Sequence, residues 1–359
     1  MRLLIAGGGT GGHLYPGIAV AEEIVRRGGE VLFVGTSRGL EARAVPAAGY
    51  ALELLEVSGL KRVGPMAILR SLFRLPKAFL RSLSILRRFR PDVVLGVGGY
   101  ASGPLVLAAA LWGYPSAIQE QNSVPGITNR ILSRLVRVVM VAFDEARRFF
   151  PAGNVETVGN PVRSKLVTTL TAGGADANAG PRIFVVGGSQ GARAVNDLVM
   201  TAVEVLANSG SLPALVHQTG PSDESRCNER YRVLGLADRI EVRPFIDDMA
   251  AEYHRASLVI ARAGALTLAE LAIAGRPAVL IPLPTATDDH QSKNAARFAQ
   301  AGAAIVLNQS TSTGAELAQL LSDLLADSGR RQAMATAMRS LARPKAAAEI
   351  VDRLEKLKG

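Results

Sequence analysis

Residues 1–17 read MRLLIAGGGTGGHLYPG, and residues 181–192 read PRIFVVGGSQGA. Each segment is an apolar run that enters a glycine-rich loop and then a helical pattern, so the same strand–loop–helix unit occurs twice. Further strand-like runs alternate with helical ones at 31–35, 93–98, 116–119, 214–218, 240–245, 258–263 and 278–283. This alternation is typical of parallel sheets with helical crossovers. The chain of 359 residues is therefore predicted to form two α/β domains, each with a doubly wound parallel sheet.

The composition excludes several classes of protein. With 48% hydrophobic and 20% charged residues, the chain is neither disordered nor a coiled coil. Its one cysteine, Cys227, excludes a disulfide framework and a cysteine-based zinc site. The apolar run at the N-terminus is too short for a signal peptide, so we expect a cytoplasmic protein. Residues 93–119 carry no charge, but glycines and prolines interrupt them, which favours strand, turn, helix and strand over a membrane span.

The net charge of +10 is concentrated in one segment. Residues 57–91 contain nine basic residues and no acidic one. Within them, residues 66–90 form a predicted amphipathic helix that Pro76 should kink or divide. A basic amphipathic helix with excess apolar surface is typical of an anchor on anionic lipid, and the alternative is an ordinary helix with a solvated basic face. The residues predicted to meet the membrane are Arg70, Leu72, Phe73, Arg74, Lys77, Phe79, Leu80 and Arg81.

The first glycine loop satisfies G-x-G-x-x-G, a pattern that is weak on its own. A dinucleotide site also needs a carboxylate at the end of the second strand, and Val34-Gly35-Thr36 offers none. The loop still offers backbone N–H groups at the N-terminus of a helix, which we expect to begin near Pro16. Such groups can bind an oxygen that carries negative charge. His13 in this loop is a candidate catalytic imidazole, since histidine titrates near neutral pH; the alternative is a turn-capping histidine.

The second half offers three more loops that follow strands. Ser189 in GGSQGA and the following amides would cradle a phosphate, unless the loop is a structural turn. The segment 264–275 is expected to begin a helix, and the amides of its first turn would form another anion site. Glu270 on this helix would bind the two hydroxyls of a ribose; the alternative is a solvated helix residue. Gln291 is a candidate for sugar hydroxyls. In the first half, Glu120 and Asn122 are polar groups at a strand end. No D-x-D motif occurs, which favours a transfer without metal.

Seven segments in this order closely resemble the MurG family of bacterial glycosyltransferases: GGGTGGHLYPG, GGYASGP, EQNSVPGITN, GNPVR, GGSQGA, RAGALTLAE and DDHQSKNA. Members of this family add N-acetylglucosamine (GlcNAc) to the lipid-linked muramyl-peptide precursor of peptidoglycan. The resemblance spans almost the whole chain and implies a GT-B fold, two Rossmann-like domains facing across a cleft. Residues 1–162 with 344–359 would receive the lipid acceptor, and residues 163–343 would bind UDP-GlcNAc.

The resemblance also implies roles for single residues. The diphosphate would lie near Arg163 and Ser189, the uracil against the backbone of Ile246, and the ribose on Glu270. Asn122 and Gln291 would hold the GlcNAc hydroxyls, although His290 stands where another glutamine occurs in some relatives. The residues expected at the diphosphate and sugar are Ala265, Leu266, Thr267, Leu268 and Ala269, and those expected at the reacting centre are Thr10, Gly11, Gly12 and His13.

The predicted reaction is direct displacement at the anomeric carbon of UDP-GlcNAc by the 4-hydroxyl of the lipid-bound muramyl sugar, with inversion. His13 is the predicted base, and Glu120 is the alternative. We expect no cofactor, metal or nucleic acid, a peripheral location on the cytoplasmic face of the inner membrane, and contact with a cell-wall synthesis complex. The alternatives are a UDP-GlcNAc epimerase or diacylglycerol glycosyltransferase on the same fold, and a non-catalytic nucleotide-sugar binder at the membrane.

Overall fold

The protein is represented by a computed structural model that describes residues 1–37, 39–57, 65–172, 180–188 and 190–358, with the side chains of 65–74 excepted. The chain divides into two compact units, which are described separately. The first comprises Met1–Ser164 and Arg343–Gly359, and the second comprises Lys165–Ala342. Each unit is a parallel sheet with helices, so the predicted fold class, two doubly wound α/β domains of the GT-B type, is confirmed.

The sheet of the first unit has seven parallel strands in the order β3-β2-β1-β4-β5-β6-β7. In chain order these are β1 (Arg2–Ala6), β2 (Glu30–Gly35), β3 (Ala51–Leu54), β4 (Val93–Gly96), β5 (Ser116–Glu120), β6 (Val138–Val141) and β7 (Val155–Thr157). The central strands are apolar and buried throughout, as expected when helices cover both faces of a parallel sheet.

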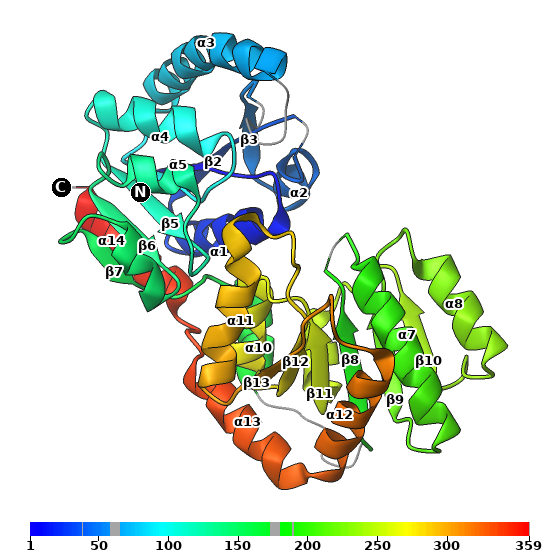
Figure 1. Cartoon of the computed structure of the whole chain (residues 1–359). Helices are drawn as coiled ribbons and strands as arrows, with labels where there is room; N and C mark the ends of the chain where they lie inside the picture. The colour runs from blue at the N-terminus through cyan, green and yellow to red at the C-terminus, as the bar shows by residue number, and fades with distance from the viewer. Residues whose placement is uncertain (38, 58–64, 173–179, 189, 359) are drawn as a thin grey trace. The chain divides into compact units, whose positions relative to one another are not determined.

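Helices cover both faces of this sheet (Figure 1). They are α1 (Gly11–Arg26), α2 (Glu41–Ala47), α3 (Pro65–Phe89), α4 (Ser102–Leu111), α5 (Ile127–Leu132), the 3-10 helix η1 (Asp144–Phe149) and α14 (Ala346–Leu357). α3, α4 and α5 share one core, and α1, α2 and α14 share the other. α14 belongs to the end of the chain, and its Ile350, Val351 and Leu354 pack with α1. Residues 93–119 form strand, turn, helix and strand, as predicted.

The sheet of the second unit has six parallel strands in the order β10-β9-β8-β11-β12-β13. They are β8 (Arg182–Val186), β9 (Ala214–Gln218), β10 (Ile240–Arg243), β11 (Leu258–Ala261), β12 (Ala278–Leu280) and β13 (Ala304–Val306). The helices are α6 (Ser164–Thr171), α7 (Arg193–Asn208), α8 (Glu224–Val233), α9 (Met249–Arg255), α10 (Ala265–Ala274), η2 (Thr287–Asp289), α11 (His290–Gln300), α12 (Gly314–Ala326) and α13 (Ser328–Ser340). α7, α8 and α12 share a core on one face of the sheet.

Candidate functional site

Three loops of the first unit lie at the carboxyl ends of neighbouring strands. β1, β4 and β5 are adjacent in the sheet, and residues 7–10, 97–101 and 121–126 follow them. The strand order reverses between β1 and β4, and ligands of open α/β sheets bind at such a point. The predicted residues of all three loops therefore share one edge of this sheet.

His13 lies on the first turn of α1, which begins at Gly11 and not near Pro16 as predicted. The preference of proline for the first turn suggested too late a start, because Pro16 lies inside the helix. The imidazole is half-buried, and its Nδ1 lies 2.7 Å from Oε1 of Gln121. The ring lies on the backbone of Gly98, where an added Cβ would be 2.8 Å from Nδ1. His13 is thus held between its own helix and the loops after β4 and β5.

A buried carboxylate, Glu41, supports the glycine loop. Its Oε2 accepts the N–H of Gly9 at 2.7 Å, and its Oε1 accepts the N–H and the hydroxyl of Thr36, both at 2.8 Å. The sequence shows no carboxylate at the end of β2, but the first residue of α2 supplies one. Since the Gly9 amide is already bonded to Glu41, a ligand anion would meet the amides at the start of α1 instead. Thr10, Gly11 and Gly12 lie there, with Thr10 and Gly12 exposed.

The carboxylate of Glu120 organises the loop after β5. The residue is 1% exposed, and its Oε1 accepts the N–H of Asn122 at 3.0 Å and the side-chain amide of Asn122 at 3.3 Å. Its Oε2 accepts the amide of Asn129 at 2.8 Å and the N–H of Gly126 at 3.4 Å. Both oxygens are engaged by the loop and by α5, so the geometry favours a positioning role for Glu120 over that of the base.

In the second unit, GGSQGA follows β8, which neighbours β11 at the reversal of strand order. The N–H of Gly191 donates to the carbonyl of Gly188 at 2.9 Å and closes the turn. A Cβ on Gly220 would lie 2.5 Å from the Cα of Gly191, so this close approach requires glycine. Ser189, the predicted phosphate ligand, lies outside the described residues.

The predicted diphosphate contacts lie on the first turns of α10. Gly264 caps this helix in an extended conformation, so the N–H groups of the first turn have no partner within the helix. The side chain of Leu268 is fully buried, and its N–H donates to the carbonyl of Gly264 at 3.0 Å. Neither its side chain nor its N–H is therefore open to a ligand. The groups that remain for an anion are the amides of Ala265, Leu266 and Thr267, and Ala269 lies half-buried on the next turn.

Glu270, the predicted ribose ligand, is buried on the same helix. Its Oε2 accepts the hydroxyl of Tyr253 at 3.1 Å. Burial raises the pKa of Tyr253 well above its ordinary value, so the phenol remains a hydrogen-bond donor to this carboxylate. Glu270 is therefore a fixed carboxylate and not a solvated surface residue.

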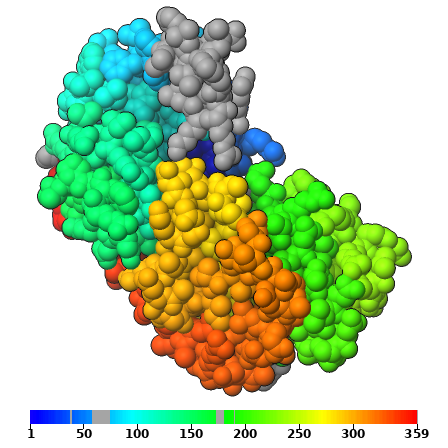
Figure 2. All heavy atoms as spheres, viewed as in Figure 1, coloured from blue at the N-terminus to red at the C-terminus, as the bar shows by residue number. Residues whose placement is uncertain are grey.

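The loop after β12 and the helix α11 carry the remaining donor residues. Gln291 accepts the N–H of Leu283 through Oε1 at 3.0 Å, which directs its amide nitrogen away from that backbone. Asp288 and Asp289 both adopt φ of 54°, and residues 287–289 are exposed. The yellow-to-orange part of the chain faces the viewer in Figure 2. Ile246, whose backbone is predicted to bind the uracil, follows β10 and has a buried side chain.

Within the described ranges, no three His, Cys, Asp or Glu side chains are placed to hold a metal ion.

Two family models match the chain. The glycosyltransferase family 28 N-terminal domain matches residues 3–141, and the C-terminal domain of the same family matches residues 182–353. A curated relative from Myxococcus xanthus is 50% identical over 98% of this chain and 92% of its own length. It is named UDP-N-acetylglucosamine--N-acetylmuramyl-(pentapeptide) pyrophosphoryl-undecaprenol N-acetylglucosamine transferase. The crystal structure of Acinetobacter baumannii MurG is 35% identical, covers 99% of both chains and gives a TM-score of 0.79.

The chain belongs to the MurG family, within glycosyltransferase family 28. The resemblance predicted from its seven segments is thus confirmed, and so is its class as a glycosyltransferase. The UDP-GlcNAc 2-epimerase of Neisseria meningitidis also aligns over 99% of this chain with a TM-score of 0.69. At 13% identity that likeness concerns the fold alone.

In this MurG-family chain, the predicted diphosphate ligand Arg163 lies in the first unit. Its guanidinium lies 5.1 Å from the ring centroid of Tyr15 on α1, a cation–π contact. The next residue, Ser164, donates its N–H and hydroxyl to Glu22 on the same helix at 2.7 and 2.8 Å. The junction between the units is therefore fastened to the helix that carries His13.

Two residues of the second unit were not singled out by the sequence. The half-buried Arg262 donates to the carbonyls of Ile281 and Pro282 at 2.9 and 3.2 Å, and burial lowers its pKa. Asn294 is fully buried on α11 and donates to the carbonyl of Ala263 at 3.3 Å. Arg262 comes directly after β11 and two residues before Gly264, so a charged residue at the end of an apolar strand was the available signal.

The basic helix α3 runs continuously through Pro76, which neither ends nor divides it. Two glutamates just before the acid-free segment pair with it: Lys77 with Glu56 at 2.7 Å, and both Arg81 and Arg88 with Glu53. The helix therefore has acidic partners although residues 57–91 contain none, because β3 brings these glutamates to it. Exposed pairs of this kind stabilise little. Arg70, Leu72, Phe73 and Arg74 lie on the helix, but their side chains are outside the described set.

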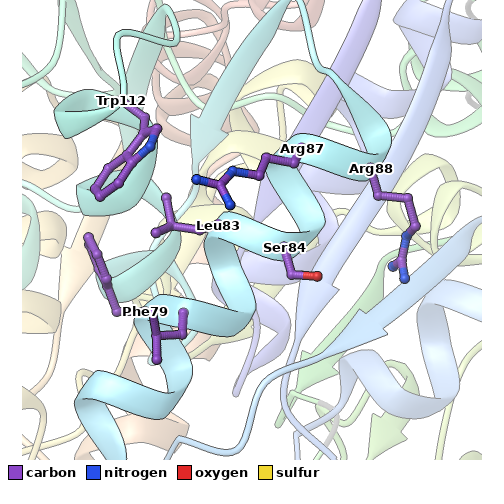
Figure 3. Close-up of a pocket in the computed structure, with 7 residues that line it drawn as sticks. Phe79, Leu83, Ser84, Arg87, Arg88 and Trp112 are labelled. Carbon is purple, nitrogen blue, oxygen red and sulfur yellow. The ribbon is translucent and has the colours of Figure 1, made fainter.

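An apolar groove lies between α3 and the end of α4. Phe79 and Trp112 meet edge to face with ring centroids 5.7 Å apart, and Leu83 lies beside them (Figure 3). Arg87 extends toward this cluster, whereas Arg88 points away from it (Figure 3). Leu80 is 65% exposed and Trp112 49% exposed, so apolar surface lies next to basic residues. Among the described residues, no helix is long and apolar enough to cross a bilayer.

Proposed function

We propose that this chain transfers GlcNAc from UDP-GlcNAc to the 4-hydroxyl of undecaprenyl-diphospho-N-acetylmuramoyl-pentapeptide, with inversion at the anomeric carbon. The name and 50% identity of the Myxococcus xanthus relative support the choice of donor and acceptor. The structural observation that carries the proposal is His13 on the first turn of α1, with its ring held by Gln121 and Gly98.

The second unit binds the donor in this proposal. The first-turn amides of α10 and the loop containing Ser189 receive the diphosphate, because unpaired N–H groups at a helix start attract phosphate. Glu270, fixed by Tyr253, accepts the ribose hydroxyls, and the backbone at Ile246 meets the uracil. Gln291 presents its side-chain amide to the GlcNAc hydroxyls, together with Asn122 of the first unit.

The acceptor oxygen attacks the anomeric carbon while its proton passes to the imidazole of His13. The bond between the anomeric carbon and the diphosphate oxygen breaks, and UDP leaves as an anion that carries the bonding electron pair. A positioned base contributes about 10²–10⁴-fold to such a step, so His13→Ala should lower turnover by that factor. A His13→Ala turnover within about threefold of wild type would remove His13 from this role.

The departing UDP is stabilised by the charge of Arg163 and by hydrogen bonds from Ser189 and the amides at the helix starts, without a metal ion. A chelator should therefore leave the rate unchanged. A loss of activity with a chelator that Mg²⁺ restores would contradict this assignment.

One assay tests the proposed reaction against its alternatives. We expect UDP release from UDP-GlcNAc when the muramyl-peptide lipid is present, and none in its absence. Turnover of UDP-GlcNAc without any lipid would indicate an epimerase, and transfer to diacylglycerol would indicate a different transferase. Binding of UDP-GlcNAc without UDP release in either mixture would indicate a non-catalytic nucleotide-sugar binder.

We also propose that the protein is peripheral, at the cytoplasmic face of the inner membrane. The exposed Leu80 and Trp112 would enter the interface, and basic residues of α3 would meet anionic headgroups. This places the acceptor-binding unit at the surface that holds the lipid-linked substrate. In this role the protein would supply peptidoglycan precursor to a cell-wall synthesis complex, and so serve cell shape and division.

A further inference from the structure

We propose that Gln121 is a positioning residue that holds His13 in the tautomer protonated at Nδ1, which leaves Nε2 as the basic nitrogen. The inference rests on the proposed function, because it refines the role of His13 as the base. Gln121 is 1% exposed and comes directly after β5, on the same side of the strand as the buried Gln119.

The surroundings of the Gln121 amide fix its orientation. Its Nε2 lies 2.9 Å from the carbonyl oxygen of Val97 and 3.3 Å from that of Gln119, and it also contacts Oε1 of Gln119. Carbonyl and amide oxygens accept hydrogen bonds and donate none. A rotated amide would place its own oxygen against these oxygens and lose every bond. Nε2 therefore occupies this position, and Oε1 of Gln121 faces His13.

An acceptor facing Nδ1 decides where the imidazole carries its proton. Oε1 of Gln121 lies 2.7 Å from Nδ1 of His13, a hydrogen-bond distance that requires a hydrogen on the nitrogen. In a neutral imidazole the other nitrogen, Nε2, then holds a lone pair. A proton from the acceptor hydroxyl passes to Nε2, while the bond from Nδ1 to Gln121 persists throughout the step.

An amide and a carboxylate beside an imidazole differ in their effect on its charge. A carboxylate beside an imidazole also selects the Nδ1–H tautomer, but its charge favours the imidazolium form. The neutral Gln121 selects the same tautomer without adding a charge. In the neutral imidazole, Nε2 is thus the nitrogen that can accept a proton.

The same reasoning gives the opposite tautomer for another histidine, which provides an internal standard. The buried His217 has Nε2 at 3.1 Å from Oδ1 of Asn196. The amide nitrogen of Asn196 donates to Thr219 and Asp223, so its oxygen faces the ring. His217 therefore carries its proton on Nε2, the reverse of His13.

Nuclear magnetic resonance on the full-length protein tests the assignment directly. Two-bond ¹H–¹⁵N correlation with labelled histidine distinguishes the two tautomers, and the chain has only four histidines. The His13 signals are those absent from His13→Gln. We expect protonated Nδ1 in His13 and protonated Nε2 in His217. A wild-type His13 protonated at Nε2 would overturn the inference. No substrate is needed, so this result does not depend on the proposed reaction.

Two variants then test the consequence for turnover. Gln121→Met keeps the volume but removes the acceptor, so His13 should lose its tautomer preference and kcat should fall at least about tenfold. Gln121→Glu keeps an acceptor toward Nδ1 and should retain the tautomer. Its second oxygen would face the carbonyls of Val97 and Gln119, and its charge favours the imidazolium form, so kcat should fall at neutral pH and recover as the pH is raised. UDP-GlcNAc affinity and the melting temperature report whether each variant is folded.

A folded Gln121→Met that keeps either the wild-type tautomer or the wild-type kcat would refute the positioning role. If Gln121→Met does not fold, the wild-type tautomer and the shift of the kcat profile of Gln121→Glu toward higher pH decide instead. Loss of the Nδ1–H tautomer in a folded Gln121→Glu would also refute the positioning role of Gln121. A wild-type enzyme that fails to transfer GlcNAc while showing the expected tautomer would reject the proposed function and leave the tautomer assignment standing.

Discussion

The side chain of Glu41 accepts the backbone N–H of Gly9 at 2.7 Å, which ties the loop that precedes His13 to the first residue of α2. In a dinucleotide-binding loop, the corresponding amides face a bound pyrophosphate. Here a side chain of the protein takes the place of a ligand at one of them. Gly8 and Gly9 adopt φ of 144° and 87°, so the loop needs both glycine and this support to hold its shape.

Glu41→Gln should lower both stability and turnover. The two carboxylate oxygens each accept a backbone N–H, from Gly9 and from Thr36. An amide has only one oxygen, so its NH₂ group would face one of these donors, at a cost of about 1–3 kcal/mol. We expect kcat to fall at least about tenfold because the start of α1 shifts, with UDP-GlcNAc affinity unchanged.

The control for this variant is Glu30→Gln in the same unit. Glu30 is 61% exposed at its side chain and pairs only with Arg2 among the described contacts. Its substitution should leave turnover and melting temperature close to wild type. Steady-state kinetics and thermal melts measure both variants. Wild-type kcat in a folded Glu41→Gln would show that the loop does not depend on this carboxylate.

Glu120→Gln distinguishes positioning from proton transfer. Both oxygens of Glu120 hold the loop of Asn122, Gly126 and Asn129, so the variant should be less stable by about 1–3 kcal/mol and slower. If Glu120 only positions the loop, the acidic limb of the pH profile of kcat/KM should persist in the variant. Disappearance of that limb would instead identify Glu120 as the base.

The repeated strand, glycine loop and helix were predictable because they depend on local patterns of apolar and glycine residues. Most predicted site residues also lie at strand ends, for the same topological reason. Glu41 and Gln121 were not predicted, because their roles arise from contacts that close only in the folded unit. Glu41 comes from a helix after β2, and Gln121 stands among polar neighbours that look alike in sequence.

The charge of α3 illustrates the same limit. A window of sequence counts neighbours along the chain, whereas Glu53 reaches Arg81 and Arg88 across the sheet edge. The helix itself and its basic character were predictable from periodicity. The ion pairs of its basic residues with Glu53 and Glu56 were not predictable, because they depend on the position of β3 beside the helix.

His217 should make the stability of the second unit depend on pH. Burial holds its pKa at about 3, below the ordinary 6.5, so the unfolded chain binds a proton that the folded chain does not. The free energy of unfolding therefore carries no penalty from His217 above about pH 6.5. It decreases as the pH drops toward 3, by about 1.4 kcal/mol per pH unit. Urea unfolding followed by circular dichroism between about pH 4.5 and 6.5 measures this slope.

His217→Gln removes the titrating group and should flatten the slope by about one proton. The matched control is His254→Gln, because His254 lies in the same unit, is only half-buried and bonds to a backbone carbonyl at 2.8 Å. That control should keep the wild-type slope. An unchanged slope in His217→Gln would mean that the acid sensitivity arises elsewhere.

Reversing the charge of α3 should release the protein from anionic vesicles. Arg70, Arg74, Lys77 and Arg81 changed together to Glu should abolish binding to phosphatidylglycerol vesicles, with UDP-GlcNAc affinity unchanged. Lys77→Glu with Arg81→Glu alone should weaken binding by about tenfold or more. The matched control, Arg230→Glu with Arg232→Glu on α8, also removes two glutamate-paired arginines but should bind as wild type.

Glu53→Gln provides the opposite test, because it frees Arg81 and Arg88 from their common partner. If these arginines meet lipid headgroups, the variant should bind anionic vesicles more tightly, by about fivefold, and less so as salt is added. Leu80→Ser with Trp112→Ser should weaken binding by removing apolar surface from the interface. Vesicle cosedimentation measures all of these variants. If the four reversals left binding intact and Glu53→Gln changed nothing, α3 would be an ordinary solvated helix, and the membrane contact would have to lie on another surface.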